Sequence, residues 1–156
     1  ALLYLTIGSA VGVCGLLLLE RLVVTDTEKV EARLHGIASD LENENIQGVL
    51  DAIHPDSRDT IARAAKEFPE FDFDVVDIKS NLKVEFDNDV DPPEAFASFN
   101  VRARGSGGGY GQFSGNVHVE VTLKKVGDEW LAHKYEYFEP THGMKKPGGK
   151  GPPLRY

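Results

Sequence analysis

The stretch that decides the fold is Gly111–Glu139, with the sequence GQFSGNVHVEVTLKKVGDEWLAHKYEYFE. Between Phe113 and Leu123 small or apolar residues alternate with polar ones. This period of two is typical of a strand with one buried face, because successive side chains of a strand point to opposite faces of a sheet. A second run rich in aromatic residues follows after Gly127-Asp128. The stretch therefore predicts two long antiparallel strands joined by a tight turn.

Two pairing registers are open for this hairpin. A two-residue Gly127-Asp128 turn would place Lys134 and Glu136 opposite valines, on the apolar face. A three-residue loop that includes Val126 avoids this, and we prefer it, although a β-bulge could mix the two registers. On the apolar face the preferred register pairs Leu123 with Leu131, Val121 with His133, Val119 with Tyr135 and Val117 with Tyr137. On the outer face it pairs Lys124 with Trp130, Glu120 with Lys134 and His118 with Glu136.

Upstream of this hairpin the sequence predicts two further strands. One is a long half-buried strand that runs to Asp87, in which apolar residues from Val76 onward alternate with polar ones. The other is Ala95–Arg104, which a loose Gly105–Gly111 connection joins to the hairpin.

Three helices are expected before the strands. The first begins at Thr25, since Thr25-Asp26-Thr27-Glu28 has the spacing of a capping box. The second is short and ends at His54-Pro55, because a residue before proline avoids helical geometry. The third begins at Asp56 or Ser57 and ends before Pro69.

The first 24 residues differ from the rest of the chain. Ala1–Leu19 contains no charged residue. As a helix it would be about 28 Å long, close to the thickness of the hydrocarbon core of a bilayer. We interpret residues 1–24 as a single-pass membrane anchor rather than a signal peptide, a lipoprotein signal or a core helix, and we leave open the side of the membrane on which the domain lies.

Charge divides the remainder of the chain. Residues 20–139 contain 25 acidic and 13 basic residues, which is a net charge of −12. This argues against nucleic acid as a partner, because binding to phosphates is largely electrostatic. Residues 140–156 contain the four remaining basic residues with several Gly and Pro, and we expect a flexible tail.

No residue set predicts a metal or a cofactor. Cys14 is the only cysteine, and the five histidines do not form a pair at zinc-ligand spacing. Asp87–Asp91 resembles the start of a calcium loop, but Pro92 stands where such a loop needs glycine. We therefore expect no metal ion and no cofactor.

The order of helices and then antiparallel strands predicts an α+β domain with a curved sheet around the helices. Glu44–Leu50 is followed by His54-Pro55-Asp56, and a Gly127–Leu131 turn and strand closes the domain. In these segments and in the order of elements, residues 25–139 resemble the NTF2-like superfamily of α+β cone domains. The resemblance implies a cone fold with a pocket on the concave face of the sheet. It does not imply one function, since the superfamily includes isomerases, cyclases, dehydratases and accessory domains.

The preferred register places His133, Tyr135 and Tyr137 on the concave face, where the resemblance implies the pocket. His54 is a further candidate, at the mouth of the cone. These four side chains either line a polar cavity around a titratable imidazole or pack against the helices with their polar tips bonded. No acid can be placed beside them from sequence.

Two functions remain open. The first is a membrane-tethered accessory domain without catalytic activity, acting beside other membrane-complex subunits or as a homodimer. The alternative is an enzyme of the isomerase, cyclase or dehydratase type that uses the cone pocket for an unknown small molecule. An open cavity with His133 or a tyrosine beside a buried carboxylate would favour the enzyme, and a filled cone would favour the accessory domain.

Overall fold

A computed structural model of the 156-residue chain describes residues 25–138. The anchor predicted over residues 1–24 and the tail predicted over residues 140–156 lie outside this range. In the described part, no helix has the length and apolar character needed to cross a membrane.

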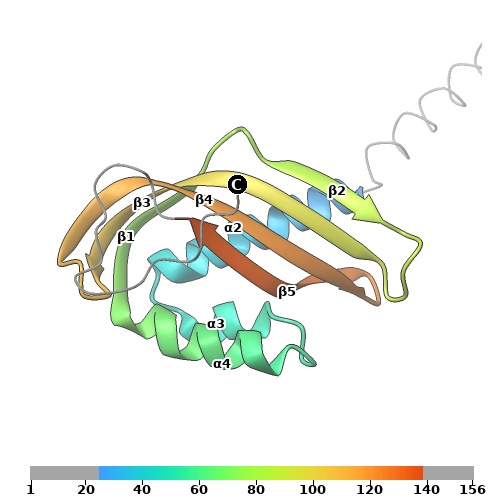
Figure 1. Ribbon diagram of the computed structural model, residues 1–156, viewed down its shortest axis with the longest axis horizontal. Helices are drawn as coiled ribbons and strands as arrows, with labels where there is room; N and C mark the ends of the chain where they lie inside the picture. Colours follow the sequence, from blue (N-terminus) through green and yellow to red (C-terminus); the bar gives the residue numbers. More distant parts are fainter. Residues whose placement is uncertain (1–24, 139–156) are drawn as a thin grey trace, which may run out of the picture.

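The domain consists of three α-helices followed by an antiparallel sheet, as the α+β prediction requires (Figure 1). The helices are α2 (Asp26–Glu42), α3 (Ile46–Asp51) and α4 (Arg58–Glu67), and a short 3₁₀ helix, η1 (Phe68–Glu70), follows α4. The strands are β1 (Phe71–Ile78), β2 (Lys83–Asp87), β3 (Glu94–Gly107), β4 (Gln112–Val126) and β5 (Glu129–Phe138). Figure 1 shows the long strands curving over the helices.

The order of strands in the sheet is β1-β3-β4-β5, with β2 also paired to β3. The single long strand predicted to run through to Asp87 is therefore wrong, because a turn after Ile78 divides it into β1 and β2. Both halves pair antiparallel with β3. β1 pairs with the C-terminal half of β3, and β2 pairs with its N-terminal half. Apolar and polar residues alternate through both halves, so the sequence pattern did not reveal the turn between β1 and β2.

Two of the three helices, α2 and α3, begin at a residue whose side chain accepts from a free backbone N–H group. The predicted capping box is confirmed, since Glu28 N donates to Thr25 Oγ1 (3.3 Å) and Thr25 N donates to Glu28 Oε2 (2.7 Å). At the start of α3, Gly48 N donates to Asn45 Oδ1 (3.2 Å). α4 begins after Ser57, whose side chain bonds elsewhere in the fold.

The core lies between α2 and the concave face of the sheet. Leu123 and Trp130 are almost completely buried, with exposed fractions of 0% and 1%. One face of β3 is completely buried, because all five of its alternating positions are buried: Ala95, Ala97, Phe99, Val101 and Ala103.

The β4–β5 hairpin has the two-residue Gly127-Asp128 turn, so our preferred three-residue register is wrong near the turn. Val126 pairs with Glu129, and Trp130 pairs with Lys125 on the buried face instead of with Lys124 on the outer face. Further along, Thr122 pairs with Lys134, Glu120 with Glu136 and His118 with Phe138, so the other predicted outer pairs are also wrong.

A β-bulge corrects the register before charged residues reach the apolar face. Leu123 pairs with Ala132, and the next pair is Thr122 with Lys134, so His133 is the extra residue. Beyond the bulge, Val121 faces Tyr135 and Val119 faces Tyr137. The two tyrosines thus return to the concave face, as predicted, with different partners.

The free edge of β5 is covered by the helices and by the α3–α4 loop. The loop pairs with Ala132, since His54 N donates to Ala132 O (2.7 Å) and Ala132 N donates to Ala52 O (2.9 Å). Three helix side chains donate to further carbonyl oxygens of β5: Arg33 to Trp130 (3.0 Å), Thr60 to His133 (2.8 Å) and Arg63 to Tyr135 (3.0 Å). This edge is therefore closed to pairing with another strand.

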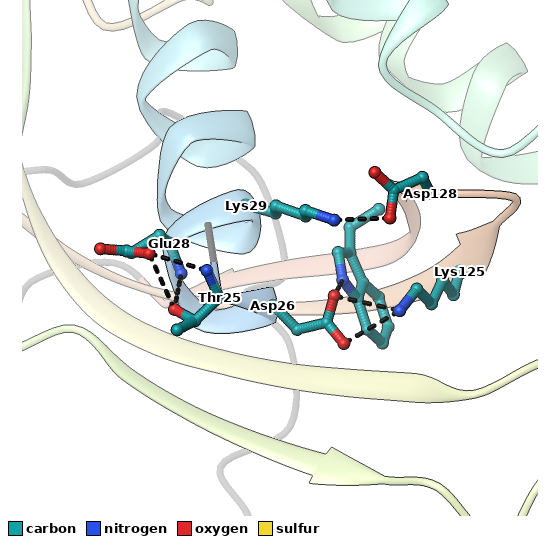
Figure 2. A network of polar contacts seen from close by, with 7 residues as sticks. Thr25, Asp26, Glu28, Lys29, Lys125 and Asp128 are labelled. Atoms are coloured by element: carbon teal, nitrogen blue, oxygen red, sulfur yellow. Dashed lines mark hydrogen bonds and ion pairs between the residues drawn. The ribbon is translucent and has the colours of Figure 1, made fainter. Parts of the chain in front are cut away.

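A polar network joins the first turn of α2 to the hairpin (Figure 2). The Asp26 carboxylate accepts hydrogen bonds from Lys125 Nζ (2.9 and 3.0 Å) and from the indole nitrogen of the buried Trp130 (3.2 Å). One turn later, Lys29 forms an ion pair with Asp128 (2.5 Å) at the tip of the hairpin. The segment in which α2 begins is thus fixed to the last two strands.

Candidate functional site

The concave face of the sheet and the helices enclose a cavity of about 250 Å³. Its walls come from α2, α3 and the end of α4 on one side, and from β1, β3, β4 and β5 on the other. Most of the lining is aliphatic or aromatic. The polar side chains of the lining are few: Glu67, Glu70, Tyr110, Tyr135 and Tyr137.

The wall of this cavity is only partly buried. Phe71, Phe73 and Phe113 line it from β1 and β4 and retain intermediate exposure, as do Val119 and Ile37. Apolar side chains on the inner face of a sheet are normally buried fully by the layer that packs on it. In this domain the helices leave part of the inner face open.

Tyr135 provides the main polar contact of the cavity wall. Its hydroxyl group donates to Glu67 Oε2 (3.0 Å), and the guanidinium group of Arg63 lies over its ring, 4.4 Å from the centroid. Burial, reinforced by the negative charge of Glu67, raises the pKa of Tyr135. The phenol therefore stays protonated and acts as a hydrogen-bond donor.

Glu67 already has two donors. Besides the Tyr135 hydroxyl group, it accepts a hydrogen bond from Arg63 Nε on Oε1 (3.0 Å). Arg63 is also close to Glu136, at 3.6 Å. The sequence did not allow us to place an acid beside the candidate residues. The structure places Glu67 beside Tyr135, but Glu67 is paired with Arg63 and its side chain is 30% exposed.

Tyr137 lines the same cavity nearer its rim, with an exposed fraction of 36%. The Arg63 guanidinium group lies 5.5 Å from the centroid of its ring. The structure thus places both predicted tyrosines at the cavity.

His133 does not line the cavity, which corrects our prediction. As the extra residue of the bulge, it is held by Ser57, whose Oγ lies 2.5 Å from His133 Nδ1. Burial lowers the pKa of His133, and the positive charge of Lys124 adds to this effect.

His54 is also absent from the cavity lining, so its prediction as a residue at the mouth of the cone is wrong. It is buried in the α3–α4 loop, where its Nδ1 accepts a hydrogen bond from Asp56 N (3.2 Å). Its ring lies 6.3 Å from that of His133. The two histidines therefore belong to one structural cluster at the covered edge of β5.

The Ser57–His133 pair has the composition of an activated nucleophile, but its position does not suit that role. Ser57 has an exposed fraction of 6%, and no carboxylate among the described residues forms a hydrogen bond with His133. A nucleophile must reach a substrate, and its base is normally oriented by a third group. The pair instead fixes the start of α4 to the bulge.

No group of three or more potential metal-ligating side chains occurs in residues 25–138. The calcium-like segment forms a simple acidic turn, in which Asp89 N donates to Asp87 Oδ1 (3.0 Å).

Sequence reasoning missed Arg63 and Glu67 as site residues. Their spacing of four on a helix does predict an ion pair. It does not predict that the pair would lie against Tyr135, which is far along the chain and is positioned by the bulge.

The fold and the cavity define an α+β domain with three helices on a five-stranded antiparallel sheet and an open, mainly apolar cavity. No protein-family model matches the chain, and no curated protein is significantly similar to it in sequence.

Proposed function

We propose that the domain is a non-catalytic binding module that holds a small apolar molecule in its cone. The observation that carries this proposal is the cavity of about 250 Å³, whose apolar walls remain partly exposed. An apolar wall in contact with water is unfavourable by roughly 25 cal/mol per Å², and an apolar ligand would remove this penalty. Ligand pockets are commonly concave and apolar with a few polar groups, as this cavity is.

Catalysis is the second candidate, and the Tyr135–Glu67 pair is the observation that favours it. A general base needs a lone pair aimed at the substrate and a pKa near the working pH. Both Glu67 oxygens already accept hydrogen bonds, from Arg63 and Tyr135. The raised pKa of Tyr135 disfavours its phenolate form. These features suit a wall that orients a ligand better than one that transfers protons.

From the sequence we further propose that residues 1–24 tether this module to a membrane, and that the domain acts as an NTF2-like accessory domain. Because the edge of β5 is covered, the outer face of the sheet and the opposite edge, formed by β1 and β2, are the surfaces that we propose for a homodimer or for another membrane-complex subunit. Chemical cross-linking of the full chain in membranes tests these partners: recovery of the uncross-linked monomer alone would refute this role.

Binding can be tested with 4-phenylbutan-1-ol, a neutral probe with an apolar body. The full chain is titrated while the methyl NMR signals of Val117, Val119 and Val121 are followed, because all three valines line the cavity. We expect saturable shifts of these signals. Val119→Phe, which fills the cavity, should abolish the shifts.

The matched control is Glu120→Phe, which adds a phenyl ring at the neighbouring, exposed position on the opposite face. This variant should bind the probe like the wild type. Circular dichroism verifies that both variants are folded. Equal binding by the two variants, or no binding by the wild type, would refute the proposed function.

A further inference from the structure

The charge of the cavity wall has one sign. Among the described residues that line it, the charged ones are Glu67 and Glu70, and the lining contains no lysine, arginine or histidine. A ligand with a carboxylate or phosphate group would meet no cation on this wall. A ligand with a positive charge would meet two carboxylates.

Glu70 is the carboxylate whose charge is not balanced locally. Within the described part of the chain, no hydrogen bond or ion pair involves its side chain, and the fold uses only its backbone carbonyl, which accepts from Gly108 N (2.9 Å). Glu67 differs, since Arg63 neutralises it in part. Arg63 itself lies between Glu67 and Glu136, so it adds little net positive charge to the region.

Aromatic rings line the same cavity as these carboxylates, of which Glu70 is exposed and Glu67 is partly buried. Next to Glu70, Phe71 packs against Phe73 (5.4 Å between centroids), Phe113 (5.9 Å) and Tyr110 (6.5 Å). Next to Glu67, Phe68 stacks on Tyr135 at 5.6 Å. All six of these rings line the cavity. The face of an aromatic ring carries negative potential and attracts cations, most strongly where water is excluded.

The cavity also limits the size of the ligand. Its volume of about 250 Å³ lies just below the range of roughly 300–1,000 Å³ that is common for drug-sized ligands. A compact molecule of about a dozen non-hydrogen atoms suits this space.

We propose that the ligand is a lipophilic cation, a molecule with a compact apolar body and one ammonium group. Its body packs against the aliphatic walls, and its charge lies near Glu67 and Glu70 among the aromatic rings. This inference deepens the function proposed above and rests on it.

A set of three probes that differ only in the end group tests the charge preference. 4-Phenylbutylamine is a cation, 4-phenylbutan-1-ol is neutral, and 4-phenylbutanoate is an anion. They are titrated into the full chain in lipid nanodiscs at pH 7, with the cavity valine methyl signals as the readout. We expect the amine to bind about tenfold more tightly than the alcohol. We expect the anion to bind least.

The test variant is Glu70→Gln, and its matched control is Asp72→Asn. Both substitutions remove one negative charge, but Asp72 does not line the cavity. Glu70→Gln should weaken binding of the amine several-fold and leave binding of the alcohol unchanged, whereas Asp72→Asn should change neither. Because partitioning of the probes into lipid is the same for both variants, this comparison isolates the cavity. A second variant, Glu67→Gln, should weaken binding of the amine in the same direction.

The outcomes separate the two proposals. If the alcohol binds as tightly as the amine, or if Glu70→Gln and Asp72→Asn weaken binding of the amine equally, the cation preference is refuted and the binding module stands. If none of the three probes shifts the cavity signals, both proposals are refuted.

Discussion

Removal of the Asp26 carboxylate should destabilise the domain much more than its position near the start of α2 suggests. In Asp26→Ala the buried indole N–H of Trp130 loses its acceptor, and Lys125 loses its ion-pair partner. Trp130 is 1% exposed with Asp26 in place, and Asp26 Oδ1 is the acceptor of its indole N–H. The matched control is Asp128→Ala, which removes the carboxylate that pairs with Lys29 in Figure 2.

The magnitude follows from the burial of each partner. An unsatisfied buried donor costs about 1–3 kcal/mol. The ion pair adds at most about 1 kcal/mol, because the side chain of Asp26 is 40% exposed and solvent screens the charge. An acidic residue in the first turn of a helix contributes a further ~0.3–1 kcal/mol. These terms overlap, so we expect a loss of about 2 kcal/mol for Asp26→Ala, and less than about 0.5 kcal/mol for Asp128→Ala, whose side chain is 84% exposed.

The assay is urea unfolding of each variant, followed by far-ultraviolet circular dichroism. If the same variants are unfolded by heat, a loss of about 2 kcal/mol in a domain of this size corresponds to a decrease in Tm of roughly 8 °C. Asp26→Asn separates hydrogen bonding from charge, since its amide oxygen can still accept from the indole. We expect Asp26→Asn to lose about 1 kcal/mol, roughly half as much as the alanine variant.

The charge also predicts a dependence on pH. The hydrogen bond from Lys125, followed by that from Trp130, lowers the pKa of Asp26 below its usual 3.8. The stabilisation is therefore complete above pH 3.8 and disappears as the pH falls through the lowered pKa. If Asp26→Ala and Asp128→Ala lose the same stability at pH 7, the assigned role of the indole hydrogen bond is wrong.

Three further predictions concern stability. Leu123→Ala should lose about 2–5 kcal/mol in urea unfolding, because Leu123 is completely buried, and a loss below 1 kcal/mol would contradict its place in the core. Gly107→Ala should be more destabilising than Gly109→Ala in the same measurement. Both glycines have positive φ, but only at Gly107 would a Cβ atom collide with the Glu70 backbone. Equal losses of stability would disagree with this packing. Burial keeps the pKa of His133 below 6.5, so the fold favours the neutral imidazole; its contribution is complete above pH 6.5 and is lost as the pH falls below that value. His133→Asn should remove this part of the pH dependence in unfolding measurements between pH 8 and pH 5, and an unchanged profile would exclude the histidine as its source.

Local signals in the sequence predicted the elements that depend on neighbouring residues. The capping box at Thr25 acts within four residues, and the structure contains both of its hydrogen bonds. The alternating sequence of Ala95–Arg104 predicted a strand there, and β3 covers this range, because the side-chain period of a strand is set by its own backbone. Pro69 also marked the end of α4, which stops at Glu67, whereas α3 stops at Asp51, three residues before the predicted end at His54.

Distant contacts decided what these signals could not. The bulge at His133 depends on Ser57 and Thr60, which are more than seventy residues away in the chain and bond its side chain and carbonyl group. The hairpin alone offered two registers, and neither included the contacts that the α3–α4 loop makes with β5. The same contacts explain why His133, which we predicted at the cavity, does not line it, whereas Glu67, which we did not predict, does. The bulge turns the imidazole toward Ser57 and leaves Tyr135 facing the end of α4.

The sequence by itself therefore determined the three helices and the acidic character of the domain, because periodicity, capping and composition are properties of short segments. Only the tertiary structure decided the register of β5, the division between β1 and β2, and the residues that line the cavity. Each of these depends on which segments meet after the chain folds, and a pattern read along one strand contains no information about the elements that pack on its edge.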